Sequence, residues 1–282
     1  LSRVEGDASL SSDRRRVWWA GLTALGILGV SVAGQRGVSG WPALLLAAFA
    51  LTLAYGPRLL PKGTWRGRRG LPSVSATRSL LSAGFFGAET YVPLSLVQHR
   101  GLTVSQAGLL LTSAAVMWSL GSVLAANLPA LASKLLRVRL GAICVLIGTA
   151  AGALSLIGSV PVLVVAAVWS IGGLGMGMAA STLGVLLLDC SAAGEQGVNS
   201  AAMQTSDAAV QSLVLAAGSV VFAIMLATHE MTGYVLVFAV AAACAVLGVA
   251  SSVRASSTTS TDADDDIVLT PDGLGRDDDA VD

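Results

Sequence analysis

Long windows without a charged residue alternate with short polar segments along most of the chain. A membrane-crossing helix needs roughly 20 apolar residues and satisfies its own backbone amides within the hydrocarbon. The uncharged stretch 140–188 is too long for one crossing, and its Gly-Ser-Val-Pro turn at 158–161 divides it in two. The pattern therefore predicts eight transmembrane helices, over residues 17–34, 41–60, 79–98, 105–128, 140–158, 161–188, 198–228 and 231–253.

The composition agrees with a membrane protein and narrows its chemistry. Apolar residues make up 54% of the 282 residues and charged residues 12%, against about 25% charged in soluble domains, and the mean hydropathy is +0.74. The chain has 17 basic and 17 acidic residues. The basic residues do not form a patch that would indicate nucleic-acid binding. The three cysteines have no CxxC spacing, and no metal or cofactor motif occurs. We predict an all-α polytopic protein of the cell membrane, surrounded by the lipid bilayer.

Lysine and arginine gather in alternate connections, and the positive-inside bias places these connections and both termini in the cytoplasm. The connections between them carry only Arg36 and Arg100. The tail holds nine of the seventeen acids and is predicted to be disordered. The predicted division is a polar lead (1–16), two helices (17–60), a basic cytoplasmic linker (61–78), a six-helix bundle (79–253) and an acidic cytoplasmic tail (254–282).

Two carboxylates lie inside predicted spans, Glu89 near the middle of the third and Asp207 in the seventh. The windows place no lysine, arginine or histidine with them at depth, so we expect no ion pair for either. A low-dielectric environment favours the neutral form of a carboxyl group, and acids within a membrane usually mark a functional site. We therefore predict that Glu89 and Asp207 couple proton movement. The alternative is a neutral acid that only hydrogen-bonds a neighbouring helix.

Asp207 has two polar neighbours at helical spacing. Gln204 lies three residues before it and Gln211 four residues after it, so the three side chains form one polar stripe on a helix of small residues. Such a stripe either lines a cavity or joins helices. We predict that Gln204 and Gln211 line a cavity.

Aromatic residues and a proline accompany Glu89. Phe85 and Pro93 share its helical face, and Pro93 removes an amide where the helix can then bend. Trp118 lies among small residues of the fourth span, where packing is the more common role and an aromatic cavity wall is the alternative. We predict Phe85, Pro93 and Trp118 as cavity-lining residues.

The sixth span contains the densest glycine, in WSIGGLGMGMAAS. Gly173 and Gly177 have the small-xxx-small spacing, with Gly175 between them, which lets a neighbouring backbone approach closely. No strand precedes this run, so a phosphate-binding loop is not indicated. We predict close helix packing there. The chain has neither an HExxH nor a GxSxG motif, and we expect no enzyme.

Two stretches resemble the C-terminal half of major facilitator superfamily permeases, in particular the multidrug-efflux type of actinobacteria. They read GFFGAETYVPLSLVQHRGLTVSQAGLLLTSAAVMWSLGS and WSIGGLGMGMAASTLGVLLLDCSAAGEQGVNSAAMQTSD, and the likeness extends over residues 71–253. The resemblance implies that the last six spans are the second half of that fold. Residues 17–60 would then be either the end of the first half in a twelve-helix protein or the central pair in a fourteen-helix one.

The resemblance also implies a function. In that fold one half rocks against the other around a site in the middle of the membrane. We expect proton-coupled export of a small molecule, with the missing N-terminal half required for transport. Two other interpretations stay open: a truncated remnant or assembly partner that does not transport, and an ion channel.

Overall fold

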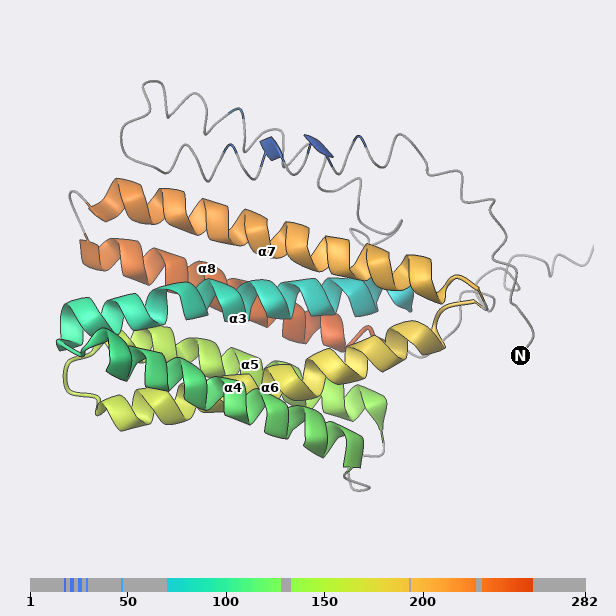
Figure 1. The fold of residues 1–282 in the computed structure, drawn as a ribbon, viewed down its shortest axis with the longest axis horizontal. Helices are drawn as coiled ribbons and strands as arrows, with labels where there is room; N and C mark the ends of the chain where they lie inside the picture. The colour runs from blue at the N-terminus through green and yellow to red at the C-terminus, as the bar shows by residue number, and fades with distance from the viewer. Residues whose placement is uncertain are drawn as a thin grey trace, which may run out of the picture.

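The computed structural model describes residues 70–127, 133–192, 194–226 and 230–255, together with seven isolated positions before Gly70. Across the four described stretches the fold is all-α, without strands. The helices are α3 (Leu71–Arg100), α4 (Val104–Asn127), α5 (Lys134–Leu156), α6 (Val162–Asp189), α7 (Gln196–Leu226) and α8 (Glu230–Ser252) (Figure 1). All six are long and apolar enough to cross a membrane, so the prediction of an all-α fold with several helices able to span a membrane is confirmed. The predicted count of eight includes two spans, 17–34 and 41–60, which lie outside the described residues except for those seven positions.

Two helices begin earlier than the uncharged windows predict. α3 begins at Leu71, eight residues before the predicted span, and α5 begins at Lys134 instead of at residue 140. Gly70, with φ at 87°, and Pro72 in the first turn start α3, since proline fits where a helix amide has no partner. Ser133 caps α5 by accepting an amide hydrogen bond. Basic residues that the windows excluded therefore lie inside both helices.

The helices run alternately up and down, so charged residues collect at the two ends of the bundle. We call them the Lys134 end, which also carries Asp189, and the Arg100 end, which also carries Glu230. α6 packs against α4 and α5, and α3 packs against α7 and α8. The two groups join where α3 and α8 contact α5, which leaves α3 near the centre (Figure 1).

Hydroxyl groups connect α3 to its neighbours along its length. Thr77 donates to the hydroxyl oxygen of Ser251 on α8 at 2.9 Å, and the hydroxyl oxygens of Ser95 and Ser155, on α3 and α5, lie 2.6 Å apart. Each hydrogen bond between membrane helices contributes about 0.6 kcal/mol on average. These bonds join α3 to α8 near one end of the bundle and to α5 near the other.

Glycines on α6 allow close helix approach on two sides. A Cβ on Gly173 would lie 2.3 Å from the carbonyl oxygen of Ala114, and a Cβ on Gly177 would lie 2.0 Å from that of Trp118, both on α4. A Cβ on Gly175 would lie 2.5 Å from a backbone carbonyl oxygen of α5. Because these positions lack side chains, α6 packs with its backbone directly against both neighbours.

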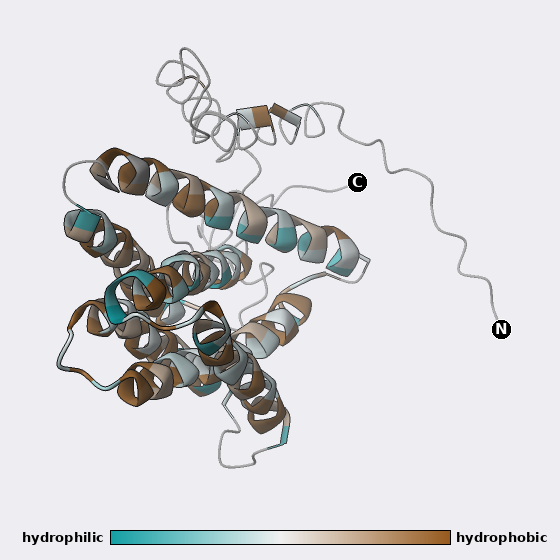
Figure 2. Cartoon of the chain, turned by 60° about the vertical axis from the view of Figure 1, so that its left-hand side comes forward, coloured by the Kyte–Doolittle hydropathy of each residue, from teal (hydrophilic) through white to brown (hydrophobic). Residues whose placement is uncertain are grey.

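Of the six helices, α4 and α7 are the least covered by the others. They have the smallest shares of buried residues and lie on opposite sides of the bundle (Figure 1). α4 exposes Leu109, Val116 and Val123. α7 is hydrophilic over the half near the Lys134 end and hydrophobic over the other half (Figure 2). Both helices therefore present apolar surface that suits lipid or further helices.

Candidate functional site

Glu89 lies near the middle of α3, and its side chain is half-buried. None of the three ion pairs found among the described residues includes it. A carboxylate in the middle of a membrane helix is costly when it has no partner. Within the described bundle, the Glu89 carboxylate is therefore neither paired nor fully enclosed.

Pro93 lies one turn beyond Glu89 on the same face of α3. It has no amide hydrogen, so the carbonyl oxygen of Glu89, four residues earlier, lacks its usual helical donor. A groove of about 380 Å³ opens beside this turn between α3 and α4, and its lining includes Thr90, Pro93 and Leu111. The turn that carries Glu89 therefore borders an open groove.

Asp207 on α7 is paired, which corrects the prediction that no basic residue accompanies it. Arg78 Nε lies 3.2 Å from Asp207 Oδ2, and Arg78 Nη1 donates to the carbonyl oxygen of Ala180 on α6 at 3.0 Å. The two charged side chains are 19% and 12% exposed. The sequence windows missed this partner because they began the third span at Ser79, whereas α3 begins at Leu71 and includes Arg78.

Further polar groups gather around this ion pair. Asp207 Oδ1 is buried and has no hydrogen-bond partner among the described residues. The hydroxyl groups of Ser75, Ser79 and Ser82, all within four residues of Arg78 on α3, are also buried without a partner in that part of the chain. This stretch of α3 thus has three buried hydroxyl groups that make no hydrogen bond to the described residues.

Arg78 and Glu89 lie on the same face of α3. They are eleven residues apart, close to three helical turns, which corresponds to about 16 Å along the helix axis. Since Arg78 reaches both Ala180 on α6 and Asp207 on α7, this face is directed toward the side of α3 on which α6 and α7 lie. One polar face therefore holds a fixed ion pair near the Lys134 end and an unpaired carboxylate at mid-height.

The predicted polar stripe on α7 is divided by its surroundings. Asp207 is buried, Gln211 is half-buried and Gln204 is exposed. The hydrogen bonds found for Asp207 in the described region go to Arg78 and to neither glutamine. The structure therefore separates the acid from the two amides that sequence spacing grouped with it.

Aromatic rings from three helices meet at the turn of α3 that precedes Glu89. Phe85, on the preceding turn, is 2% exposed and stacks on Trp169 of α6 with ring centroids 4.7 Å apart. Trp118 of α4 meets Phe85 edge to face at 5.7 Å and is half-buried. The structure brings together two of the predicted cavity-lining residues, Phe85 and Trp118, but Phe85 lies in the core. Sequence reasoning missed Trp169, which no spacing rule connects to either residue.

The arrangement offers proton exchange at one carboxylate and a fixed charge pair at another. The described residues contain no group of three or more histidine, cysteine, aspartate or glutamate side chains that could hold a metal ion. Glu89 is the one acid at mid-depth in this part of the chain without an ionic partner. It is therefore the strongest candidate for a functional group.

Comparison with known proteins does not identify a family. No protein-family model matches the chain, and no curated protein is significantly similar to it. A family assignment consequently depends on the two stretches that resemble permeases.

Proposed function

We propose that the chain is the second half of a secondary active transporter of the major facilitator type, which exports a small molecule in exchange for protons. Glu89 takes up and releases the proton. Asp207 is held by Arg78 and connects α7 to α3, while Trp118 forms an aromatic wall beside Glu89. Both termini lie in the cytoplasm, which places the Lys134 end on the inner side of the cell membrane.

The proposal rests on the different surroundings of Asp207 and Glu89. Asp207 is buried and paired with Arg78, so its charge is compensated. Glu89 is half-buried and lacks an ionic partner within the described bundle. Coupling needs a group whose charge depends on which side of the membrane it contacts, and an unpaired acid at mid-depth meets this requirement.

The exposed sides of α4 and α7 support a partner bundle. α4 is apolar, α7 is apolar over the half away from the Lys134 end, and both helices have few buried residues. A transporter of this type places its substrate between two halves that rock against each other. A first half seated against α4 and α7 would enclose the face of α3 that carries Glu89.

Replacing Glu89 with glutamine tests the proposal, because the amide keeps the size of the side chain and removes its proton exchange. We expect Glu89→Gln in the complete transporter to abolish the accumulation of ethidium in everted membrane vesicles driven by a pH gradient. Its abundance in the membrane should stay normal. The matched control is Glu195→Gln, which changes an exposed acid between α6 and α7 and should leave accumulation unchanged.

Other outcomes favour the rival interpretations. Ethidium accumulation that is the same in Glu89→Gln as in the parent would assign Glu89 a structural role, as in a non-transporting assembly partner. Single-channel currents from the purified protein in a planar bilayer would instead indicate an ion channel. The six described helices share a common core, with Leu81, Trp169 and Tyr234 fully buried, so a bundle that serves only in assembly is structurally reasonable.

A further inference from the structure

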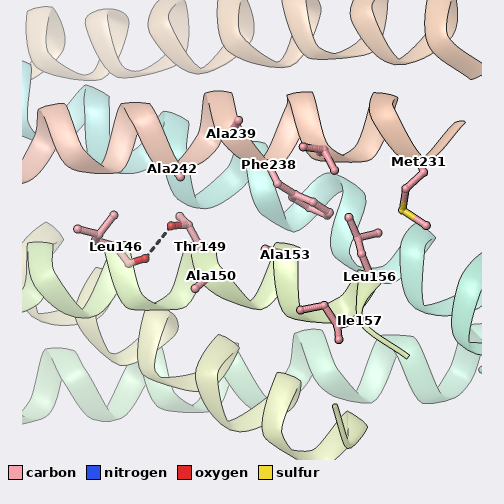
Figure 3. Close-up of a pocket in the computed structure, with 11 residues that line it drawn as sticks. Leu146, Thr149, Ala150, Ala153, Leu156, Ile157, Met231, Phe238, Ala239 and Ala242 are labelled. Atoms are coloured by element: carbon pink, nitrogen blue, oxygen red, sulfur yellow. Dashed lines mark hydrogen bonds between the residues drawn. The ribbon is translucent and has the colours of Figure 1, made fainter. Parts of the chain in front are cut away.

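A groove of about 670 Å³ runs between α5 and α8 (Figure 3). α5 and its C-cap residue line it from Leu146 to Ile157, and α8 lines it from Met231 to Ala242. The two helices are antiparallel, so Ile157 and Met231 lie at the Arg100 end, while Leu146 and Ala242 lie near the middle of their helices. The groove therefore begins at one end of the bundle and stops at about half its height.

The lining of this groove is hydrocarbon. Of its eleven residues only Thr149 is polar, and the Thr149 hydroxyl donates to the carbonyl oxygen of Leu146 at 2.7 Å (Figure 3). A polar ligand would lose its water there without gaining a hydrogen bond, at a cost of several kcal/mol. The surface around the groove is apolar too, since Ile147, Val235 and Val240 are exposed. The groove therefore selects an apolar occupant.

The floor of the groove is a close contact between the two helices. A Cβ on Gly152 of α5 would lie 2.3 Å from the Phe238 ring of α8, so the helices touch directly beneath the groove. An extended hydrocarbon chain is narrow enough to lie in the seam above this contact.

The length of the groove matches one leaflet of a bilayer. Eleven residues separate Leu146 from Ile157, and the same number separates Met231 from Ala242, which corresponds to about 16 Å along each helix. The hydrocarbon core of a bilayer is about 30 Å thick. One acyl chain that enters at the Arg100 end would therefore fill the groove and end near the bilayer midplane.

A positive charge stands at the mouth of the groove. The guanidinium group of Arg100 donates to the carbonyl oxygens of Ile157, which lines the groove, and Val160. Arginine has five N–H donors, so three have no partner among the described residues. Guanidinium pairs well with phosphate, because its planar set of donors matches the phosphate oxygens.

We propose that this groove binds one acyl chain of a phospholipid from the leaflet at the Arg100 end, with the lipid phosphate held by Arg100. The apolar lining and the length of the groove fit the acyl chain. The guanidinium group at the mouth selects a phospholipid over a neutral lipid. This site lies away from Glu89 and does not depend on the proposed transport activity.

The test fills the groove and counts the lipid that the protein retains. Ala239 lines the groove and is exposed, whereas Ala243, one turn away on α8, is exposed outside it. The full chain, purified in dodecyl maltoside with palmitoyl-oleoyl-phosphatidylglycerol added, is analysed by native mass spectrometry. We expect one retained phospholipid in the parent and in Ala239→Ser, at least tenfold weaker retention in Ala239→Trp, and unchanged retention in Ala243→Trp. Palmitoyl-oleoyl-glycerol, which lacks the phosphate, should not be retained.

Three results would overturn the proposal. These are equal phospholipid retention in Ala239→Trp and the parent, equal retention of the neutral diacylglycerol, and a dimer mass that only Ala239→Trp removes. The last result would show that a second copy of the chain occupies the groove. Circular dichroism checks that each variant is folded, and Ala239→Leu, which fills the groove only in part, replaces the tryptophan variant if that variant fails to fold.

Discussion

Replacing Arg78 with alanine is expected to lower the free energy of unfolding by about 3 kcal/mol, since breaking a buried ion pair leaves the other charge uncompensated. Asp207 would lose its one ionic partner found in the described region, and its Oδ1 already has no hydrogen bond there. The carbonyl oxygen of Ala180 would lose a donor as well. Titration with dodecyl sulfate in mixed micelles, followed by circular dichroism, measures the loss.

A second ion pair provides the matched control for this prediction. Lys134 and Asp189 also join two helices, but their side chains are 40% and 38% exposed, and exposed pairs contribute about 0–1 kcal/mol. Lys134→Ala should therefore have a much smaller effect. The double variant Arg78→Met with Asp207→Leu should recover most of the stability, because both charges are removed together. Equal losses in Arg78→Ala and Lys134→Ala would contradict the assignment of a buried pair.

The second large effect is expected from Gly177→Ala on α6. The new methyl group would lie 2.0 Å from the backbone carbonyl oxygen of Trp118, which cannot move without shifting α4. Overpacking of this kind costs about 1–3 kcal/mol, and a clash with backbone places Gly177→Ala at the upper end of that range. The same dodecyl sulfate titration measures the loss.

Gly184→Ala is the matched control, because it makes the same change on the same helix where a Cβ would meet nothing within 4 Å. Alanine favours helix over glycine by about 1 kcal/mol, so this variant should be neutral or slightly more stable than the parent. The two glycines should thus respond in opposite directions. If Gly177→Ala is as stable as Gly184→Ala, then α4 and α6 are not packed as closely as described.

The uncharged windows predicted the ends of the six described helices closely wherever the helix has no charged residue inside that end. The fourth span was expected over 105–128 and is Val104–Asn127, and the sixth was expected over 161–188 and is Val162–Asp189. The starts of α3 and α5 were missed, because a window that stops at the first charge excludes Arg78 and Lys134. Both residues lie inside their helices and have acidic partners on other helices.

For similar reasons, some features of the candidate site could be predicted from the sequence and others could not. Glu89 could be identified from sequence because a single acid in an apolar run is conspicuous whatever its neighbours are. The pairing of Asp207 could not, because Arg78 is 129 residues away in the chain and meets it only when α3 and α7 pack together. The same holds for Trp169, which reaches Phe85 through the contact between α3 and α6.

Water access to position 89 tests the central claim most directly. In the full-length protein in its native membrane, with the three native cysteines replaced by serine, Glu89→Cys is treated with a membrane-impermeant, charged methanethiosulfonate. Two control positions bracket it: Val92→Cys, on the next turn of α3 and 0% exposed, and Val240→Cys, on the apolar surface of α8. Each variant is also treated with membrane-soluble N-ethylmaleimide. Val92→Cys should react with neither reagent, and Val240→Cys should react only with N-ethylmaleimide. The account predicts fast reaction of Glu89→Cys with the charged reagent, whereas reaction with N-ethylmaleimide alone, or no reaction, would contradict it.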